Sequence, residues 1–282
     1  MKTFALSAFL GLTLTTSATA LPLLDQGSQA QAFADPFFTT DYDFNGIVSL
    51  SNCSGSLVRF DDSQDSDPGM VLTNGHCVQM MRPGQVYVNT MSFRGFSVLN
   101  SAGEKIGQVR ARTLLYATMT DTDMAIYQLR ESFQTIQDQY DVTPLTLSRD
   151  YAEVGDPIEI ISGYWKRGYS CEIEAFVHRL KEADWIFKES MRYSQPGCNV
   201  IGGTSGSPVV LAGTKTIIGV NNTGNESGRE CEMNNPCEID EDGTIRYEIG
   251  FNYAQQTSWI YSCRRDNGQL DLGVEGCRLP KP

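Results

Sequence analysis

Leu72-Thr73-Asn74-Gly75-His76-Cys77 is the most informative stretch of this sequence, and two later strings complete its pattern. These are Asp123-Met124-Ala125-Ile126 and Gly202-Gly203-Thr204-Ser205-Gly206-Ser207-Pro208. Together they supply a histidine, an aspartate and a glycine-flanked serine in that order. A serine hydroxyl is a weak nucleophile at neutral pH, so it needs a base to take its proton and a third group to orient the base. The three strings therefore predict nucleophilic catalysis by a serine.

His76 is the candidate base. The other histidine, His178, lies in a strand-like run, and we expect it to be a structural residue on that strand or at its end. Asp123 is the candidate orienting acid, since it directly precedes an apolar run and would stand at the start of a buried strand. Asp121 is the competing acid, because side chains two residues apart on a strand point to the same face. We expect Asp121 to be a solvated loop residue.

Ser205 is the candidate nucleophile. Glycines on both sides allow positive φ angles and let the N–H groups of Gly203 and Ser205 converge as an oxyanion hole. Ser207 and Thr204 are the alternative hydroxyls, but neither has glycine on both sides. A plain Gly/Ser turn between strands is the non-catalytic interpretation.

Short apolar and β-branched runs separated by Gly, Asn, Asp and Pro are typical of an antiparallel barrel or sandwich. They occur at 46–50, 56–60, 70–73, 86–89 and 124–129, and again at 158–161, 172–177, 208–211, 217–220 and 247–251. The Gln-rich stretch 132–148 predicts a linker. Residues 253–261 lack Gly and Pro and predict one short terminal helix, and no long amphipathic helix is expected.

The N-terminus has the pattern of a secretory signal peptide: Met1-Lys2, an apolar run to Leu14, then small residues ending at Ala20. No later segment offers about 18 consecutive apolar residues for a membrane span. We therefore expect a secreted protein, extracellular or periplasmic, with five regions. They are a signal peptide (1–20), a leader, propeptide or N-terminal extension (21–44), a first barrel (45–135), a second barrel with its linker (136–252), and a C-terminal helix and disulfide-containing tail (253–282).

Without the signal peptide, 21 basic residues face 34 acidic ones, which argues against a nucleic-acid partner. All eight cysteines lie in the exported part, so four disulfides are the default. A metal site is the weaker interpretation, because there are two histidines and no paired CxxC spacings. We expect no cofactor and no metal, although weak calcium binding by acidic loops and glycosylation of Asn-x-Ser/Thr sites stay open.

Residues 45–60 and Leu72–Cys77 resemble the chymotrypsin/trypsin family of serine endopeptidases. The Asp123 and Ser205 strings resemble its other two signature segments, especially in bacterial and glutamyl-endopeptidase-like branches. The resemblance covers residues 45 to 255 and implies an all-β fold of two antiparallel six-stranded β-barrels with the site between them. It implies that His76 and Asp123 come from the first barrel and Ser205 from the second.

The resemblance also implies a Cys53–Cys77 bridge beside the base. Pairing the other six cysteines with their nearest neighbours is one of 15 possibilities. That pairing joins Cys171 to Cys198, Cys231 to Cys237 and Cys263 to Cys277.

Two departures from the family pattern concern activation. Zymogen-activated relatives carry an acid just before the nucleophile to pair with a freshly cut N-terminal amine, whereas this chain has Thr204 there. No Lys or Arg lies between Lys2 and Arg59, so a trypsin-like activating cut is not expected.

The specificity of cleavage stays open. The residue six before the nucleophile is Asn199, not an acid, so a preference for Lys or Arg is not supported. No histidine follows Ser205, unlike in glutamyl-specific relatives. Val220, Asn222 and Thr223 are expected to border the pocket and to pair with the substrate backbone.

These observations predict a serine endopeptidase that acts as a monomer on proteins or peptides through an acyl-enzyme. A catalytically inactive homologue that serves as a secreted binding module is the alternative. An α/β-hydrolase is excluded because position 207 is Ser and no histidine follows Ser205. A cysteine protease built on Cys77 would use a residue expected to be in a disulfide.

Overall fold

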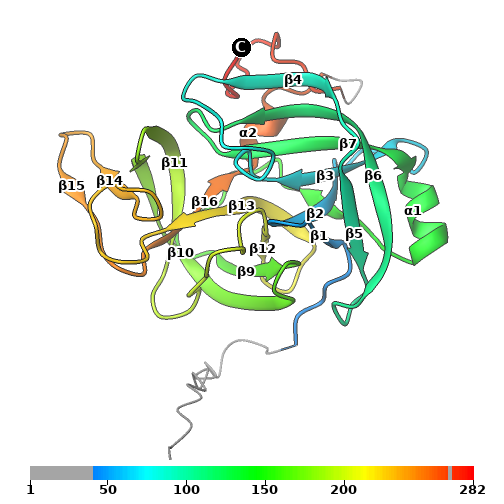
Figure 1. Ribbon diagram of the computed structural model, residues 1–282, viewed down its shortest axis with the longest axis horizontal. Coiled ribbons are helices and arrows are strands. Elements are labelled where there is room, and N and C mark those ends of the chain that lie inside the picture. Colours follow the sequence, from blue (N-terminus) through cyan, green and yellow to red (C-terminus); the bar gives the residue numbers. More distant parts are fainter. Residues whose placement is uncertain (1–40, 266–268) are drawn as a thin grey trace, which may run out of the picture. The chain divides into compact units, whose positions relative to one another are not determined.

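The computed structural model describes residues 41–265 and 269–282. The expected signal peptide and most of the expected leader therefore lie outside the described residues. The described residues belong to one compact unit that is almost entirely β-structure (Figure 1). None of their helices is long and apolar enough to cross a membrane.

Six antiparallel strands form a closed first barrel. They pair in the order β1–β5–β6–β7–β3–β2, and β2 pairs with β1 to close the ring. The edge strand β4 (Val86–Met91) adds to β6. The ring strands are β1 (Ile47–Ser49), β2 (Ser54–Arg59), β3 (Pro68–Thr73), β5 (Gly95–Leu99), β6 (Lys105–Thr118) and β7 (Met124–Ser132).

Six further antiparallel strands close a second barrel, in the order β9–β10–β11–β16–β13–β12 and back to β9. They are β9 (Pro157–Ser162), β10 (Arg167–Glu182), β11 (Trp185–Tyr193), β12 (Pro208–Leu211), β13 (Thr216–Gly224) and β16 (Asn252–Gln256). A short hairpin of β14 (Cys237–Ile239) and β15 (Ile245–Arg246) extends β10. The predicted pair of six-stranded antiparallel barrels is confirmed.

One short strand, β8 (Leu145–Leu147), joins the two barrels. It pairs in parallel with β2 on one side and with β13 on the other. Each barrel has its own buried centre, because alternate side chains of a strand point inward. Phe96 and Tyr127 pack edge to face in the first, and Ile160 and Val209 are fully buried in the second.

Helix α1 (Phe133–Tyr140) occupies the stretch where the sequence predicts a linker. Its start is capped by Ser132, whose hydroxyl accepts the N–H of Thr135 at 3.1 Å. Phe133 and Ile136, one turn apart, are buried against the first barrel. These local signals outweigh the polar composition of the segment.

The predicted short C-terminal helix is confirmed, but it occupies only the last part of 253–261, and residues 253–256 are strand. Pairing with β11 and β13 places Asn252–Gln256 in the second barrel as β16. Only α2 (Ser258–Tyr261) is helical. Cross-strand hydrogen bonds and burial therefore determine the strand conformation of 252–256, which the absence of Gly and Pro does not predict.

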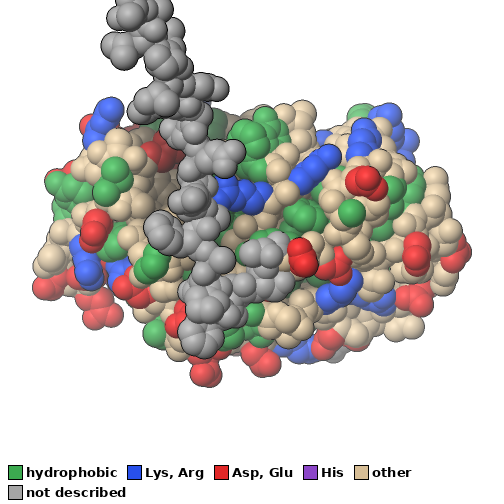
Figure 2. Space-filling model, turned by 90° about the horizontal axis from the view of Figure 1, so that it is seen from below, with side chains coloured by type: hydrophobic (Ala, Val, Ile, Leu, Met, Phe, Trp, Pro, Cys, Tyr) green, Lys and Arg blue, Asp and Glu red, His purple; other side chains and the backbone are tan. Residues whose placement is uncertain are grey.

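Four disulfides form, in the nearest-neighbour pairing. They are Cys53–Cys77, Cys171–Cys198, Cys231–Cys237 and Cys263–Cys277. On the face seen in Figure 2, acidic and basic side chains are interspersed wherever the grey atoms do not cover it. No continuous basic area is visible there.

Candidate active site

His76 and Asp123 meet because β3 and β7 pair, with Thr73 opposite Ala125. His76 follows β3 and Asp123 directly precedes β7. Nδ1 of His76 lies 2.6 Å from Oδ2 of Asp123, and the backbone N–H of His76 donates to Oδ1 at 3.1 Å. Asn74 donates from Nδ2 to the Asp123 carbonyl at 2.8 Å. Both the acid and the loop that carries the histidine are thereby fixed.

The two side chains differ in exposure, which is 1% for Asp123 and 23% for His76. Burial disfavours a charged imidazole. The Asp123 carboxylate opposes this by attraction and by its hydrogen bond, Glu182 adds to the attraction, and the pKa of His76 is raised as a result. An Nδ1–H directed at the carboxylate leaves Nε2 as the proton acceptor.

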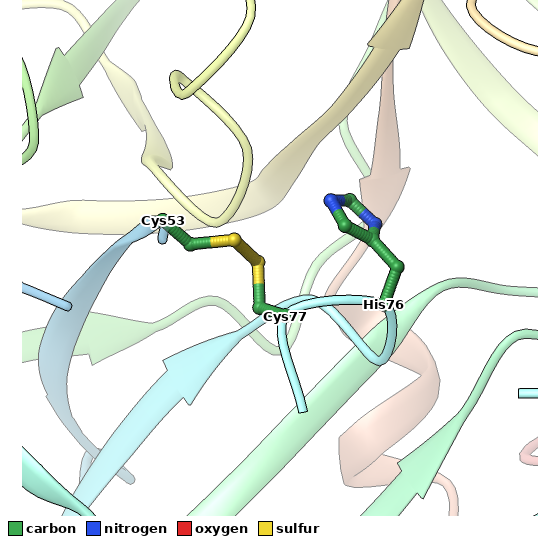
Figure 3. A group of neighbouring side chains, drawn as sticks. All are labelled: Cys53, His76 and Cys77. Carbon is green, nitrogen blue, oxygen red and sulfur yellow. A yellow bond between two sulfur atoms is a disulfide. The ribbon is translucent and has the colours of Figure 1, made fainter. Parts of the chain in front are cut away.

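The Cys53–Cys77 disulfide lies beside His76 (Figure 3). The sulfur and ring nitrogen atoms of Cys53, His76 and Cys77 lie within 4.8 Å of one another, a spacing that suits a metal ion. Metal-binding cysteines are thiolates, however, and both sulfurs here are joined to each other. The bridge therefore ties the histidine loop to the start of β2.

Ser205 lies on the loop before β12. Ser54 donates its backbone N–H to the Ser205 carbonyl at 2.8 Å, and Gly206 donates its N–H to the carbonyl of Asn221 at 3.0 Å. These two bonds hold the loop between the barrels. The partly exposed Ser205 hydroxyl donates to the carbonyl of Asn222 at 3.2 Å, and no hydrogen bond joins it to His76 in the part of the chain that is described. Catalytic hydrogen bonds are often unformed in a substrate-free site.

The backbone of this loop presents two free donors. Gly203 has φ +89°, and neither its N–H nor that of Ser205 donates to another described residue. Unpaired backbone N–H groups are the kind of donor that an oxyanion hole uses.

The alternative residues occupy other environments. Ser207 and Thr204 are fully buried, and the Ser207 hydroxyl donates to the Thr204 carbonyl at 2.6 Å. Asp121 pairs with Lys188 at 2.8 Å. His178 is exposed on β10. None of these groups shares a hydrogen bond with His76.

The residues expected to contact substrate divide into two groups. Val220 points into the core, and Asn199 is exposed at the surface. Asn222 and Thr223 lie where β13 has lost its β12 neighbour, since that pairing ends at Val220 opposite Pro208. No strand of the described residues pairs with this edge of β13, which leaves it open for an added strand.

Glu182, at the end of β10, is a site residue that the sequence did not indicate. Its side chain accepts the N–H of Asn234 at 2.8 Å and hydrogen-bonds Thr223. The pKa of the Glu182 carboxyl is raised overall, because the effect of burial outweighs the lowering by these hydrogen bonds and by the nearby His76. Asn252 is a second such residue, because it is buried directly behind Gly224.

Residues 53–220 match the family model of the trypsin-like peptidase domain. No curated protein matches the chain. Solved structures include the MamO protease domain of Magnetospirillum magneticum, which is 12% identical with a TM-score of 0.47 and covers 79% of this chain and 97% of that one.

The Nocardiopsis protease NAPase is 16% identical, with a TM-score of 0.44 and coverage of 75% of this chain and 90% of that one. A glutamic-acid-specific serine protease described as using a histidine triad in substrate binding is also 16% identical, with a TM-score of 0.40 and the same coverage. Likenesses this low transfer no residue role.

Proposed function

Because the chain belongs to the trypsin-like peptidase family, we propose that it is an exported serine endopeptidase that hydrolyses peptide bonds through an acyl-enzyme. The observation that carries this proposal is the buried Asp123 carboxylate held 2.6 Å from Nδ1 of His76, beside a loop that offers the Ser205 hydroxyl and two free N–H donors. The N-terminal pattern of a signal peptide and the four disulfides support export into an oxidising compartment.

In the proposed reaction, Ser205 Oγ attacks the carbonyl carbon of the scissile bond while Nε2 of His76 takes the hydroxyl proton. Asp123 stabilises the imidazolium that forms, and the N–H groups of Gly203 and Ser205 hold the oxyanion. Collapse of the tetrahedral intermediate breaks the C–N bond, and His76 gives its proton to the leaving amine. Water then attacks the acyl-enzyme by the same route and regenerates Ser205.

The substrate backbone is proposed to pair with the open edge of β13 at Asn222–Gly224. Main-chain hydrogen bonds supply affinity in this mode of recognition, whatever the side chains. Asn222 lies on this edge, whereas Asn252 faces Gly224 from β16, which pairs with the other edge of β13. The Nδ2 group of Asn222 is buried without a hydrogen-bond partner among the described residues.

The proposal is tested by comparing the secreted wild-type protein with Ser205→Ala on casein. We expect Ser205→Ala to reduce hydrolysis by roughly 10⁶-fold, to background. Ser101→Ala, at an exposed turn, is the matched control and should retain full activity. A fluorophosphonate probe followed by peptide mass spectrometry should label Ser205 and not Ser207.

Casein hydrolysis that survives Ser205→Ala would contradict the assignment of the nucleophile. If the wild-type protein neither hydrolyses casein nor reacts with the probe, the chain is instead a binding module built on a protease fold.

A further inference from the structure

The turn between β9 and β10 places two aromatic side chains against the loop of residues 202–207, which carries Ser205 and is called the nucleophile loop below. Tyr164 and Trp165 are 41% and 48% exposed, and their rings pack edge to face with centroids 5.0 Å apart. A Cβ atom on Gly203 would lie 2.9 Å from Nε1 of Trp165 and 3.1 Å from Cδ1 of Tyr164. The pair therefore covers the part of the loop that carries one of the two proposed oxyanion donors.

Trp165 makes a directed bond to this loop: its indole N–H donates to the carbonyl of Gly202 at 2.8 Å. The Gly202 carbonyl and the Gly203 N–H belong to the same peptide group. In a planar trans peptide these two groups point in opposite directions. A bond that fixes the carbonyl toward Trp165 therefore fixes the N–H toward the other side.

The Gly202–Gly203 peptide needs such a restraint. Glycine on both sides of the peptide removes the Cβ atoms that would limit its rotation, and Gly203 already has φ +89°. Thr204 anchors the following residue by donating its N–H to the Ile201 carbonyl at 3.0 Å. The carbonyl of Gly202 itself is held by Trp165.

The turn that carries Trp165 is itself fixed to the nucleophile. Tyr164 donates its backbone N–H to Oγ of Ser54 at 3.1 Å, and Trp165 donates its own to Oγ of Ser162 at 3.2 Å. Ser54 also donates its backbone N–H to the Ser205 carbonyl at 2.8 Å. Ser54 of β2 thus hydrogen-bonds to both the aromatic turn and the backbone of Ser205.

We propose that Trp165 is a positioning residue that locks the Gly202–Gly203 peptide so that the Gly203 N–H faces the developing oxyanion. This inference rests on the proposed function and deepens it. Trp165 acts through Gly203 and does not take part in proton transfer. Because the Trp165 side chain is half-exposed, replacing it should not change the stability of the second barrel.

The test is Trp165→Phe, which keeps an aromatic ring and removes the indole N–H. We expect kcat to fall between about 10- and 100-fold on a peptide substrate. An oxyanion donor stabilises only the transition state, so misplacing the Gly203 N–H lowers kcat. KM should stay within about twofold of the wild-type value, because ground-state binding is unaffected. Tyr164→Phe, which leaves the same loop contacts in place, is the matched control and should leave kcat unchanged.

A second readout separates positioning from a general structural effect. A peptide aldehyde bound to Ser205 forms a hemiacetal whose oxygen uses the oxyanion hole, whereas a product-like peptide does not. Trp165→Phe should weaken the aldehyde by the same factor as kcat and leave the product-like peptide unchanged. Thermal unfolding of both variants should match that of the wild type.

Two outcomes would overturn the proposal. If KM rises while kcat is retained, Trp165 is a substrate contact. If kcat and aldehyde affinity are unchanged, the indole bond has no role in the reaction. In both cases Ser205-dependent hydrolysis by the wild type leaves the proposed function standing, whereas its absence removes both.

Discussion

Glu182 places a second carboxylate within electrostatic reach of His76, in addition to Asp123, and these are the two acids that raise its pKa. In the proposed reaction, His76 accepts the Ser205 proton only when the imidazole is neutral, so a raised pKa moves the acid limb of kcat/KM to higher pH. Glu182→Gln keeps the shape of the side chain and removes its charge. We expect the acid limb of the variant to lie at lower pH than that of the wild type, measured from kcat/KM across pH.

Asp121→Asn is the matched control for this experiment. Asp121 is also an acid close to Asp123 in sequence, but it pairs with Lys188 and does not perturb His76. Its acid limb should coincide with that of the wild type. An acid limb that stays in place or moves to higher pH in Glu182→Gln would contradict the assigned role of Glu182.

Single residues differ in how much of their role a sequence carries. His76, Asp123 and Ser205 stand in distinctive neighbourhoods of glycine, cysteine and apolar residues, so they could be proposed without a structure. Glu182 and Trp165 have no such neighbourhood. The β10–β11 hairpin and the Asn234 loop bring Glu182 to the histidine, and tertiary contacts of that kind leave no local pattern.

The nucleophile loop depends on a conformation that only glycine adopts without strain at Gly206. This residue has φ +80°, and a Cβ atom there would overlap the carbonyl oxygen of Ser54 and Oγ1 of Thr73. Gly206→Ala must therefore shift the loop away from β2 and β3. We expect kcat/KM to fall at least about 100-fold and the free energy of unfolding to drop by about 1–3 kcal/mol.

Gly213→Ala separates backbone strain from displacement of the loop. Gly213 has φ +73° in the turn between β12 and β13, but nothing lies within 4 Å of a Cβ built there. This variant should lose about 1 kcal/mol in urea unfolding and keep its activity. Equal activity of the two alanine variants would show that the tight approach of Gly206 to Ser54 is unimportant.

Strands were more predictable than helices in this chain. The runs predicted at 70–73 and 124–129 lie inside β3 and β7, because their apolar residues are buried where the strands form. Helix α1 was missed because Gln-rich composition hid the Ser132 cap and the buried Phe133 and Ile136. Strand β16 was missed because its pairing partners, β11 and β13, are distant in sequence.

The C-terminal tail returns to the first barrel and ends beside it in Figure 1. The hydroxyl of Tyr116, on β6, donates to the Pro280 carbonyl at 3.1 Å, and Leu279 is 1% exposed in the cluster that contains Ile47. The Cys263–Cys277 disulfide spans 14 residues and restrains this return of the chain. The tail thus connects the end of the second barrel to the core of the first.

Replacing both Cys263 and Cys277 by serine should lower the free energy of unfolding by about 3 kcal/mol, because a loop of this size loses entropy in the unfolded chain when it is cross-linked. The contacts of His76 and Ser205 in the proposed active site do not involve the tail, so kcat should be retained below the unfolding transition. Guanidinium unfolding and casein hydrolysis on the same samples measure the two effects. An unchanged unfolding midpoint would mean that the packing of Leu279 and its neighbours alone holds the tail, and a loss of kcat in the folded variant would mean that the tail supports the site as well as the fold.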